Sequence, residues 1–312
     1  MYESIMSISL LAALYQANTN QNSSKQLSPL LNALFAVALF SLTAPFTQLA
    51  LKDFSPEFIT FFRAGTVGLC SLILAGYLAW QLPSKKNCLL ILIGGLAVML
   101  VFPYTLALSL SQWQASDLGV VLAGIPLITA WMASVIFKDK QNLAFWLCIF
   151  VGTGLLMLFA YVQASGQFHG AVFVMLIAAG IGYSFGGQVA KSIGGFKTIC
   201  WMAIFYLPIS ALGLGFETPR MVANFQVASM DSIWALIYLV LISQWIGFHF
   251  WYGAMAKIGI AKVGQVQLLQ PFFTLLFSVL LLGVVLNAQQ FIFAGLITLT
   301  VVVSMRYKVK IT

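Results

Sequence analysis

The chain has 312 residues, of which 61% are hydrophobic and only 7% are charged, and its mean hydropathy is +0.99. Soluble domains carry charge on about a quarter of their residues, so this composition excludes a soluble protein and also a disordered or fibrous one. The apolar runs are about 20 residues long and lack the alternation of a barrel strand, which predicts an all-α integral membrane protein.

Ten transmembrane helices are predicted along the chain. Each is long enough to cross about 30 Å of hydrocarbon at about 1.5 Å per residue. The connections are short, so consecutive helices are antiparallel neighbours. The approximate ranges of the ten spans are 30–50, 57–80, 88–110, 116–137, 142–161, 168–190, 198–216, 232–255, 262–283 and 288–305.

The charged residues predict the orientation. With the N-terminus in the cytoplasm, twelve Lys and Arg residues fall inside and only Lys52 and Arg220 fall outside. This pattern obeys the positive-inside rule and predicts that both termini are cytoplasmic. Anionic lipid of the inner leaflet then explains the net charge of +8, so no nucleic-acid partner is predicted. The acidic residues on the outer side are Asp53, Glu57, Asp117, Glu217 and Asp231.

The two ends of the chain are predicted to be cytoplasmic. Residues 1–28 form an N-terminal extension, because the apolar run from Ile5 to Tyr15 is too short to span and Glu3 stands where a signal peptide would carry basic residues. Translation from Met6 or a later start is the alternative. Residues 306–312 form a basic tail. Between the ends lie two predicted five-helix repeats, residues 29–163 and 164–305.

An internal repeat appears at an offset of 145 positions. Residues 104–139 align without a gap with residues 249–284, which places Gly119 on Gly264, Pro126 on Pro271 and Thr129 on Thr274. Because each repeat has five spans, the two halves must enter the membrane in opposite directions. Inverted repeats are typical of secondary transporters that work by alternating access.

Several segments resemble those of the drug/metabolite transporter superfamily, specifically its EamA-type transporters. The resemblance covers about residues 30–305 and implies a ten-helix fold with peripheral fifth and tenth spans, in which spans 1–4 rock against spans 6–9. This sequence has Gln270, Asp139 and Val284 at positions where the family usually has glutamate. The matching segments are Lys52 to Pro56, Phe61 to Arg63, Ser109 and Leu110, Ile125 and Pro126, Phe137 to Asp139, Ala254 and Met255, Lys257, Gln270 and Pro271, and Leu282 to Val284.

Polar side chains within the spans are candidates for lining a substrate cavity, because such residues are costly in lipid. Arg63 is predicted either to bind a carboxylate or phosphate of the substrate or to reach up to Glu57 or Asp53. For the glutamines, hydrogen bonding between helices is the alternative role. The further cavity candidates are Gln48, Tyr104, Trp131, Tyr183, Gln188, Gln244, Gln267 and Gln270.

Two other kinds of residue are candidates for the transport cycle. His249 is the coupling candidate, because histidine titrates near physiological pH, and a neutral histidine that bonds across helices is the alternative. Pro126 and Pro271 are predicted to kink their helices and to permit gating, with simple packing kinks as the alternative. Neither a metal site nor a cofactor is predicted.

These observations favour a secondary active transporter of a small organic metabolite in a bacterial-type inner membrane. The resemblance implies export of an amino acid or a related metabolite. The alternative is uptake or exchange of a nucleoside-like or amino-acid-derived metabolite. A membrane-embedded enzyme is a distant alternative, because the spans contain neither paired acids nor a Cys/His cluster. The expected partners are the substrate, the lipid bilayer and protons as candidate coupling ion, with the chain as a monomer or homodimer.

Overall fold

A computed structural model describes residues 29–136, 142–163 and 170–306. The predicted extension 1–28 and all but the first residue of the predicted tail lie outside the described residues, as does Asp139. The regular structure within these ranges is helical. In the first half the helices are α2 (Pro29–Ser41), α3 (Thr43–Ala50), α4 (Pro56–Tyr77), α5 (Lys85–Gly95), η1 (Leu96–Val101), α6 (Phe102–Leu110), α7 (Ala115–Leu122), α8 (Ile125–Ile136) and α9 (Leu143–Gln163).

The second half contains longer helices. One of them, α11, continues to Val227, whereas its span was predicted to end near residue 216. The prediction ended early because Glu217 lowers the hydropathy, and hydropathy does not report a helix that continues beyond the apolar run. The helices are α10 (Gly170–Ile193), α11 (Gly195–Val227), α12 (Met230–Ile237), η2 (Tyr238–Gly247), α13 (Phe248–Ile258), α14 (Ile260–Val266), η3 (Gln267–Leu269), α15 (Gln270–Leu282) and α16 (Ala288–Arg306).

The predicted ten-span architecture is confirmed. Eight helical runs are long and apolar enough to cross a membrane, and two shorter apolar helices, Ala115–Thr129 and Ala288–Ser304, correspond to the fourth and tenth spans. Local signals explain where helices begin. The hydroxyl of Ser55 caps α4 by accepting a hydrogen bond from the amide of Phe58 at 3.1 Å, and Pro56 follows in the first turn.

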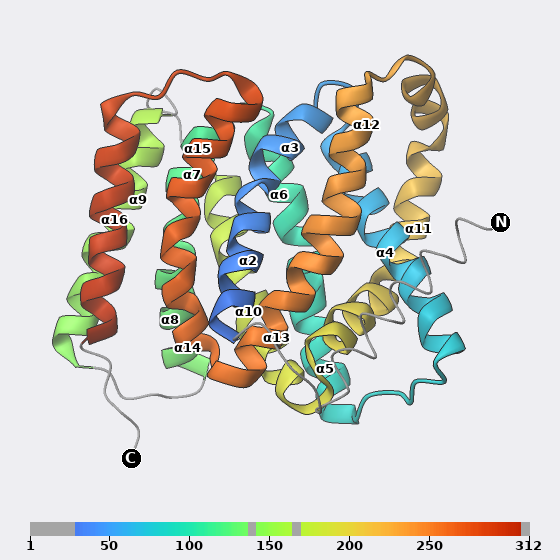
Figure 1. The fold of residues 1–312 in the computed structure, drawn as a ribbon, viewed down its shortest axis with the longest axis horizontal. Helices are drawn as coiled ribbons and strands as arrows, with labels where there is room; N and C mark the ends of the chain where they lie inside the picture. The colour runs from blue at the N-terminus through green and yellow to red at the C-terminus, as the bar shows by residue number, and fades with distance from the viewer. Residues whose placement is uncertain (1–28, 137–141, 164–169, 307–312) are drawn as a thin grey trace.

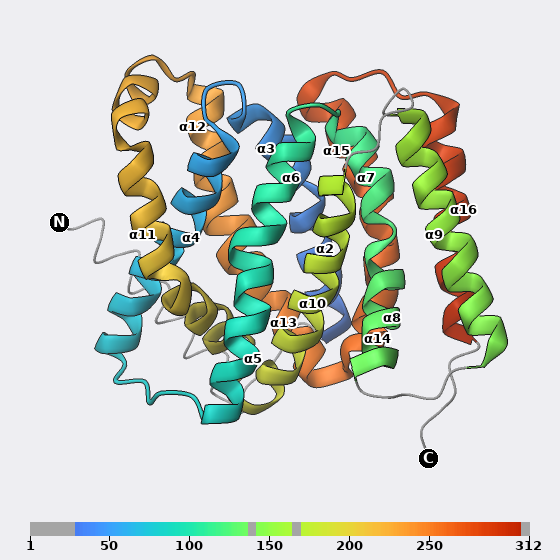
Figure 2. The ribbon, with the colours of Figure 1, turned by 180° about the vertical axis from the view of Figure 1, so that it is seen from behind.

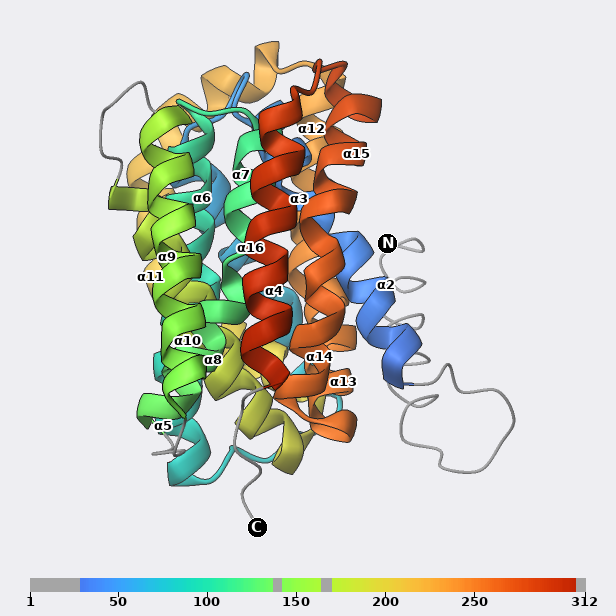
Figure 3. The same ribbon diagram turned by 90° about the vertical axis from the view of Figure 1, so that its left-hand side faces the viewer.

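The spans form a bundle with two peripheral pairs. Helices α9 and α16, the fifth and tenth spans, lie side by side at one edge of the molecule (Figures 1 and 3). Helices α4 and α11 pack together at the opposite edge, and the other spans lie between the two pairs (Figure 2). Side chains that converge from several spans can therefore meet in the middle of the bundle.

Irregular turns occur at matching places in the two halves. The wide π-helical turns η1 and η2 interrupt the third and eighth spans, and the repeat offset of 145 places residues 96–101 on residues 241–246, within η2. The fourth span breaks between α7 and α8, just before Pro126. The ninth span has the tighter 3₁₀ turn η3 just before Pro271. Each proline is the second residue of the helix that follows, where its missing N–H costs no helical hydrogen bond.

Candidate functional site

Arg63 lies in the interior of the bundle. It projects from α4, and its side chain is only 1% exposed. Its Nη2 donates hydrogen bonds to Oε1 of Gln244 at 2.8 Å and to Oγ of Ser243 at 3.3 Å. Both acceptors belong to η2, so this contact joins the second span to the eighth across the two halves of the chain.

Gln244 connects Arg63 to the other π-helical turn. Its Nε2 donates to the carbonyl of Val98 at 3.2 Å and lies 3.1 Å from Sδ of Met99, and both of these residues belong to η1. A π-helical turn releases backbone groups from the regular ladder, and such turns are frequent at functional sites. The two matching turns therefore meet at a single glutamine, whose oxygen accepts from the arginine.

The positive charge of Arg63 has no acidic partner among the described residues. Its Nε and Nη1 atoms are buried and have no hydrogen-bond partner in that part of the chain. Arg63 does not reach up to Glu57 or Asp53, which was one of the two predicted roles. Glu57 instead accepts a hydrogen bond from the hydroxyl of Tyr104 at 3.2 Å, and Asp53 binds Ser229. A buried cation without a counter-ion is costly.

Arg63 faces a small central cavity. The cavity has a volume of about 10 Å³, roughly what one water molecule needs. Its walls combine polar groups with aromatic rings. They come from the first, second, third, fourth, sixth, eighth and ninth spans: Phe40, Thr43, Ala44, Arg63, Phe102, Leu106, Leu122, Tyr183, Ser243, Phe248 and Gln270.

Close helix contacts flank this cavity on both sides. In the outer half, a Cβ added to Gly119 of α7 would lie 2.8 Å from Cγ2 of Thr274 on α15. In the inner half, a Cβ added to Gly186 of α10 would lie 2.2 Å from Cζ of Tyr252, whose hydroxyl donates to the carbonyl of Gly182 at 3.0 Å. Only glycine allows such approaches. The fourth span is therefore in close contact with the ninth, and the sixth with the eighth.

Three of the predicted cavity residues line it, namely Arg63, Tyr183 and Gln270. Gln244 is not part of the lining but accepts a hydrogen bond from Arg63. Gln267 is buried beside the cavity, and its Nε2 donates to Oε1 of Gln270 at 3.1 Å. Gln270 is also held by its backbone, because the hydroxyl of Ser41 donates to its carbonyl at 3.2 Å.

The other predicted cavity residues lie elsewhere. Gln48 accepts from the amide of Ala115 at 2.8 Å and so caps the start of α7. Tyr104 pairs with Glu57, as described above. Trp131 packs against the cluster of Leu127 and Phe145, near the peripheral α9. Gln188 accepts from Nζ of Lys191 at 3.4 Å on an exposed part of α10.

The coupling candidate lies beside the cavity wall rather than in it. The ring of His249 meets Phe196 edge-on with centroids 5.3 Å apart and Phe250 at 5.0 Å. Its Nδ1 is buried and without a hydrogen-bond partner among the described residues. The nearest connection to the central site is through its neighbour Phe248, which does line the cavity. Proton coupling through His249 stays a prediction.

Sequence reasoning missed several wall residues. Ser243 accepts from Arg63 and lies 2.8 Å from the hydroxyl of Thr43 on the first span. Phe40 and Phe248 supply rings 4.9 Å apart. Ser243 precedes Gln244 directly, so the pair of adjacent polar residues in an apolar span was a usable signal. The phenylalanines carried no such signal, because the chain has 26 of them.

Comparison with known proteins gives a consistent result. The model of the EamA-like transporter family matches residues 27–161 and, a second time, residues 169–306. The uncharacterized transporter YdeK of Bacillus subtilis (strain 168) is 31% identical over 255 residues, which cover 81% of this chain and 88% of YdeK. One crystal structure aligns with a TM-score of 0.57 and 17% identity over 91% of this chain and 98% of the other, which supports the fold alone. The chain therefore belongs to the EamA-like transporter family of the drug/metabolite transporter superfamily and is a multi-pass membrane transporter.

Proposed function

We propose that this transporter moves carboxylate-bearing small metabolites, such as amino acids or their relatives, and that Arg63 binds the carboxylate. The observation that carries the proposal is the buried guanidinium with open N–H groups at Nε and Nη1. Hydrogen bonds between a guanidinium and a carboxylate are charge-assisted and about twice as strong as neutral ones. The substrate then supplies the counter-ion that no described residue provides.

The remaining walls suit the rest of such a molecule. Phe40, Phe102, Tyr183 and Phe248 offer apolar and aromatic surface, and Gln270 offers an amide that can bind a substrate amino group without a permanent charge. Because the cavity holds only about 10 Å³, the spans must separate before a metabolite can enter. Alternating access by rocking of the two halves is the proposed mechanism, and export across a bacterial inner membrane is the proposed direction.

The test is counterflow in proteoliposomes that contain the purified full chain. Labelled amino acids are compared with the corresponding amines, which lack the carboxylate, and with nucleosides. We expect saturable exchange of one or more amino acids and no exchange of their amines. Saturable exchange of a nucleoside would instead support the alternative substrate class and overturn the role of the carboxylate.

Variants of Arg63 locate the binding site. We expect Arg63→Gln to weaken binding by about 2–4 kcal/mol, which is roughly 30- to 1,000-fold in affinity. Arg63→Lys keeps the charge and should restore part of the affinity. Both variants are checked for membrane abundance and for monodisperse elution. Equal affinity in Arg63→Gln and the unaltered protein would refute the proposal.

A further inference from the structure

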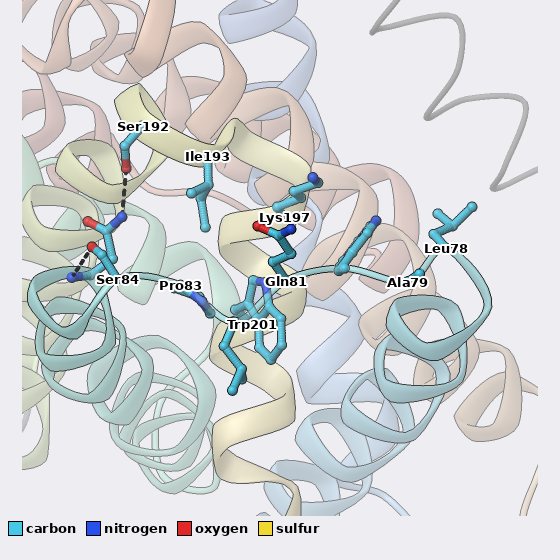
Figure 4. A pocket seen from close by; sticks show the side chains of 12 residues that line it. Leu78, Ala79, Gln81, Pro83, Ser84, Ser192, Ile193, Lys197 and Trp201 are labelled. Atoms are coloured by element: carbon cyan, nitrogen blue, oxygen red, sulfur yellow. Dashed lines mark hydrogen bonds between the residues drawn. The ribbon is translucent and has the colours of Figure 1, made fainter.

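A second cavity lies at the end of the molecule that carries the lysines, and it shares no lining residue with the central one. Its volume is about 680 Å³. The linker between α4 and α5, Leu78 to Ser84, forms one side. Asn87 on α5, Ser192 and Ile193 at the end of α10, and Lys197 and Trp201 on α11 form the rest, as Figure 4 shows.

The linker is held in a defined shape around this cavity. Ala79 has a φ of +47°, in the left-handed region that residues other than glycine rarely adopt. Trp80 lies under Nζ of Lys197, which is 5.4 Å from the ring centroid, and its ring meets Phe196 edge-on. On the other side, Nδ2 of Asn87 donates to the hydroxyl of Ser192 at 2.9 Å, and this bond is drawn in Figure 4. These contacts hold the linker against α11 and the start of α5 against the end of α10.

The charge around the cavity is of one sign. Lys197 belongs to its lining, and Lys85, Lys86 and Lys191 are exposed on the neighbouring helix ends. None of the lining residues is acidic. The acidic residues in the described part of the chain, Asp53, Glu57, Asp117, Glu217 and Asp231, belong to the segments assigned to the opposite side of the membrane. The cavity therefore favours an anion.

Apolar surface continues from the cavity along the outside of the bundle. Helix α4 ends in Tyr77, which is 74% exposed, and Leu82 in the linker is 76% exposed. Large apolar side chains on both helices that border the linker are exposed in the same way: Leu69, Leu72 and Ile73 on α4, and Leu89, Leu92 and Ile93 on α5. In a membrane such side chains contact acyl chains, and a tryptophan at this level lies among the headgroups.

We propose that this cavity binds the phosphate headgroup of an anionic phospholipid of the cytoplasmic leaflet. Lys197 contacts the phosphate, Asn87 and Ser192 offer further polar groups, and the acyl chains lie along the exposed apolar side chains of α4 and α5. Anionic lipids are concentrated in this leaflet, where each basic residue near the surface attracts them. A soluble phosphate compound would satisfy Lys197 but would leave the adjoining apolar surface without a partner, so the lipid is the better match.

The test measures lipid binding to the purified full chain, independently of transport. Thermal unfolding of the detergent-solubilised protein is followed while phosphatidylglycerol is added. Phosphatidylcholine with the same acyl chains is the first control, and glycerol 3-phosphate is the second. We expect saturable stabilisation by phosphatidylglycerol at a few lipids per protein. Stabilisation of the same size by phosphatidylcholine would overturn the proposal, and saturable stabilisation by glycerol 3-phosphate would identify a site for free phosphates instead.

Variants assign the binding to the cavity. Lys197→Gln should lower the apparent affinity for phosphatidylglycerol roughly fivefold, the loss expected for one basic residue near a membrane surface. Lys197→Arg keeps the charge and should retain the affinity, which separates lost binding from a folding defect. Lys257→Gln is the matched control, because Lys257 is an exposed lysine at the end of α13, outside the cavity. An equal effect of Lys197→Gln and Lys257→Gln would mean general surface attraction and not this site.

Discussion

Asp53 fastens the outer loop between α3 and α4 to the start of α12. Its Oδ2 accepts from the amide of Ser229 at 3.0 Å and from the hydroxyl of Ser229 at 2.7 Å. Ser229 is itself the N-cap of α12 and accepts from the amide of Ser232. The hydroxyl groups of Ser232 and Ser229 and the amide of Ser229 hold the pKa of Asp53 below its ordinary value. The carboxylate thus connects the first span to the eighth.

This contact predicts a pH dependence of stability. Because the pKa of Asp53 is lower in the folded protein, its contribution is fully present above the ordinary value of about 4 and is lost as the pH falls through the folded-state pKa. Unfolding temperatures measured between pH 3 and 6 should fall towards acid, and Asp53→Asn should reduce that slope. Asp231 is an exposed acid in the first turn of α12, and Asp231→Asn is the control. This variant should keep the slope of the unfolding temperature against pH. The same slope in both variants would contradict the prediction.

The contact partners of individual side chains could not be predicted from the sequence. Arg63 was identified because a charge within an apolar span is rare. Its partner Gln244 lies 181 positions away in the chain, and only the packing of the two halves brings them together. In the sequence, Trp131 and Tyr183 were equivalent candidates for lining the cavity, because both are aromatic residues deep in a span. Helix α8 is apolar throughout, so hydrophobic periodicity could not show that Trp131 faces α9 and not the cavity.

At the scale of helices, the close contact between α7 and α15 can be tested by cross-linking. A Cβ built on Gly119 would lie 3.0 Å from Cβ of Thr274, close to the separation of about 3.5–4.5 Å found in disulfides. With the four native cysteines replaced, the pair Gly119→Cys and Thr274→Cys should cross-link under mild oxidation. The disulfide would hold α7 against α15 and stop substrate exchange. Reduction of the disulfide with dithiothreitol should restore the exchange.

The controls for this cross-link are simple. Each single cysteine variant should be insensitive to the oxidant. Gly154→Cys combined with Thr274→Cys should not cross-link intramolecularly, because a Cβ at Gly154 has no neighbour within 4 Å. A cross-linked protein that still exchanges substrate at the full rate would show that α7 and α15 do not separate during transport.

The number of spans was predictable because hydrocarbon thickness constrains the length of an apolar run directly. The π-helical turns could not be predicted from the sequence, because Leu96–Val101 and Tyr238–Gly247 have the same apolar composition as an α-helical span. The prolines marked the breaks in the fourth and ninth spans, where the structure has a break and a 3₁₀ turn. Their role in gating stays a prediction.

For the whole molecule, two matching wide turns in opposite halves converge on one glutamine and one arginine. The inverted repeat relates η1 to η2, so any motion that exchanges the conformations of the two halves changes both turns at once. Gln244 bonds to η1 through its nitrogen and to Arg63 through its oxygen. Gln244 therefore joins the guanidinium of the proposed site to the π-helical turns of both halves.

The uncompensated charge of Arg63 also bears on the kinetics of the cycle. When the bundle closes without substrate, no described side chain pairs with Nε or Nη1 of the guanidinium. A buried pair that loses one partner costs about 3–5 kcal/mol, and even half of that cost would slow the return of the unloaded protein roughly tenfold. Exchange of substrate across the membrane should therefore run at least about tenfold faster than net efflux into substrate-free buffer, as measured with the same proteoliposomes.

If net efflux instead equals exchange, the guanidinium finds another counter-ion during the return step. In the expected case the metabolite is both the substrate and the counter-ion of Arg63. It acts as the removable half of an ion pair whose other half is built into the second span, so exchange of substrate is favoured over net transport.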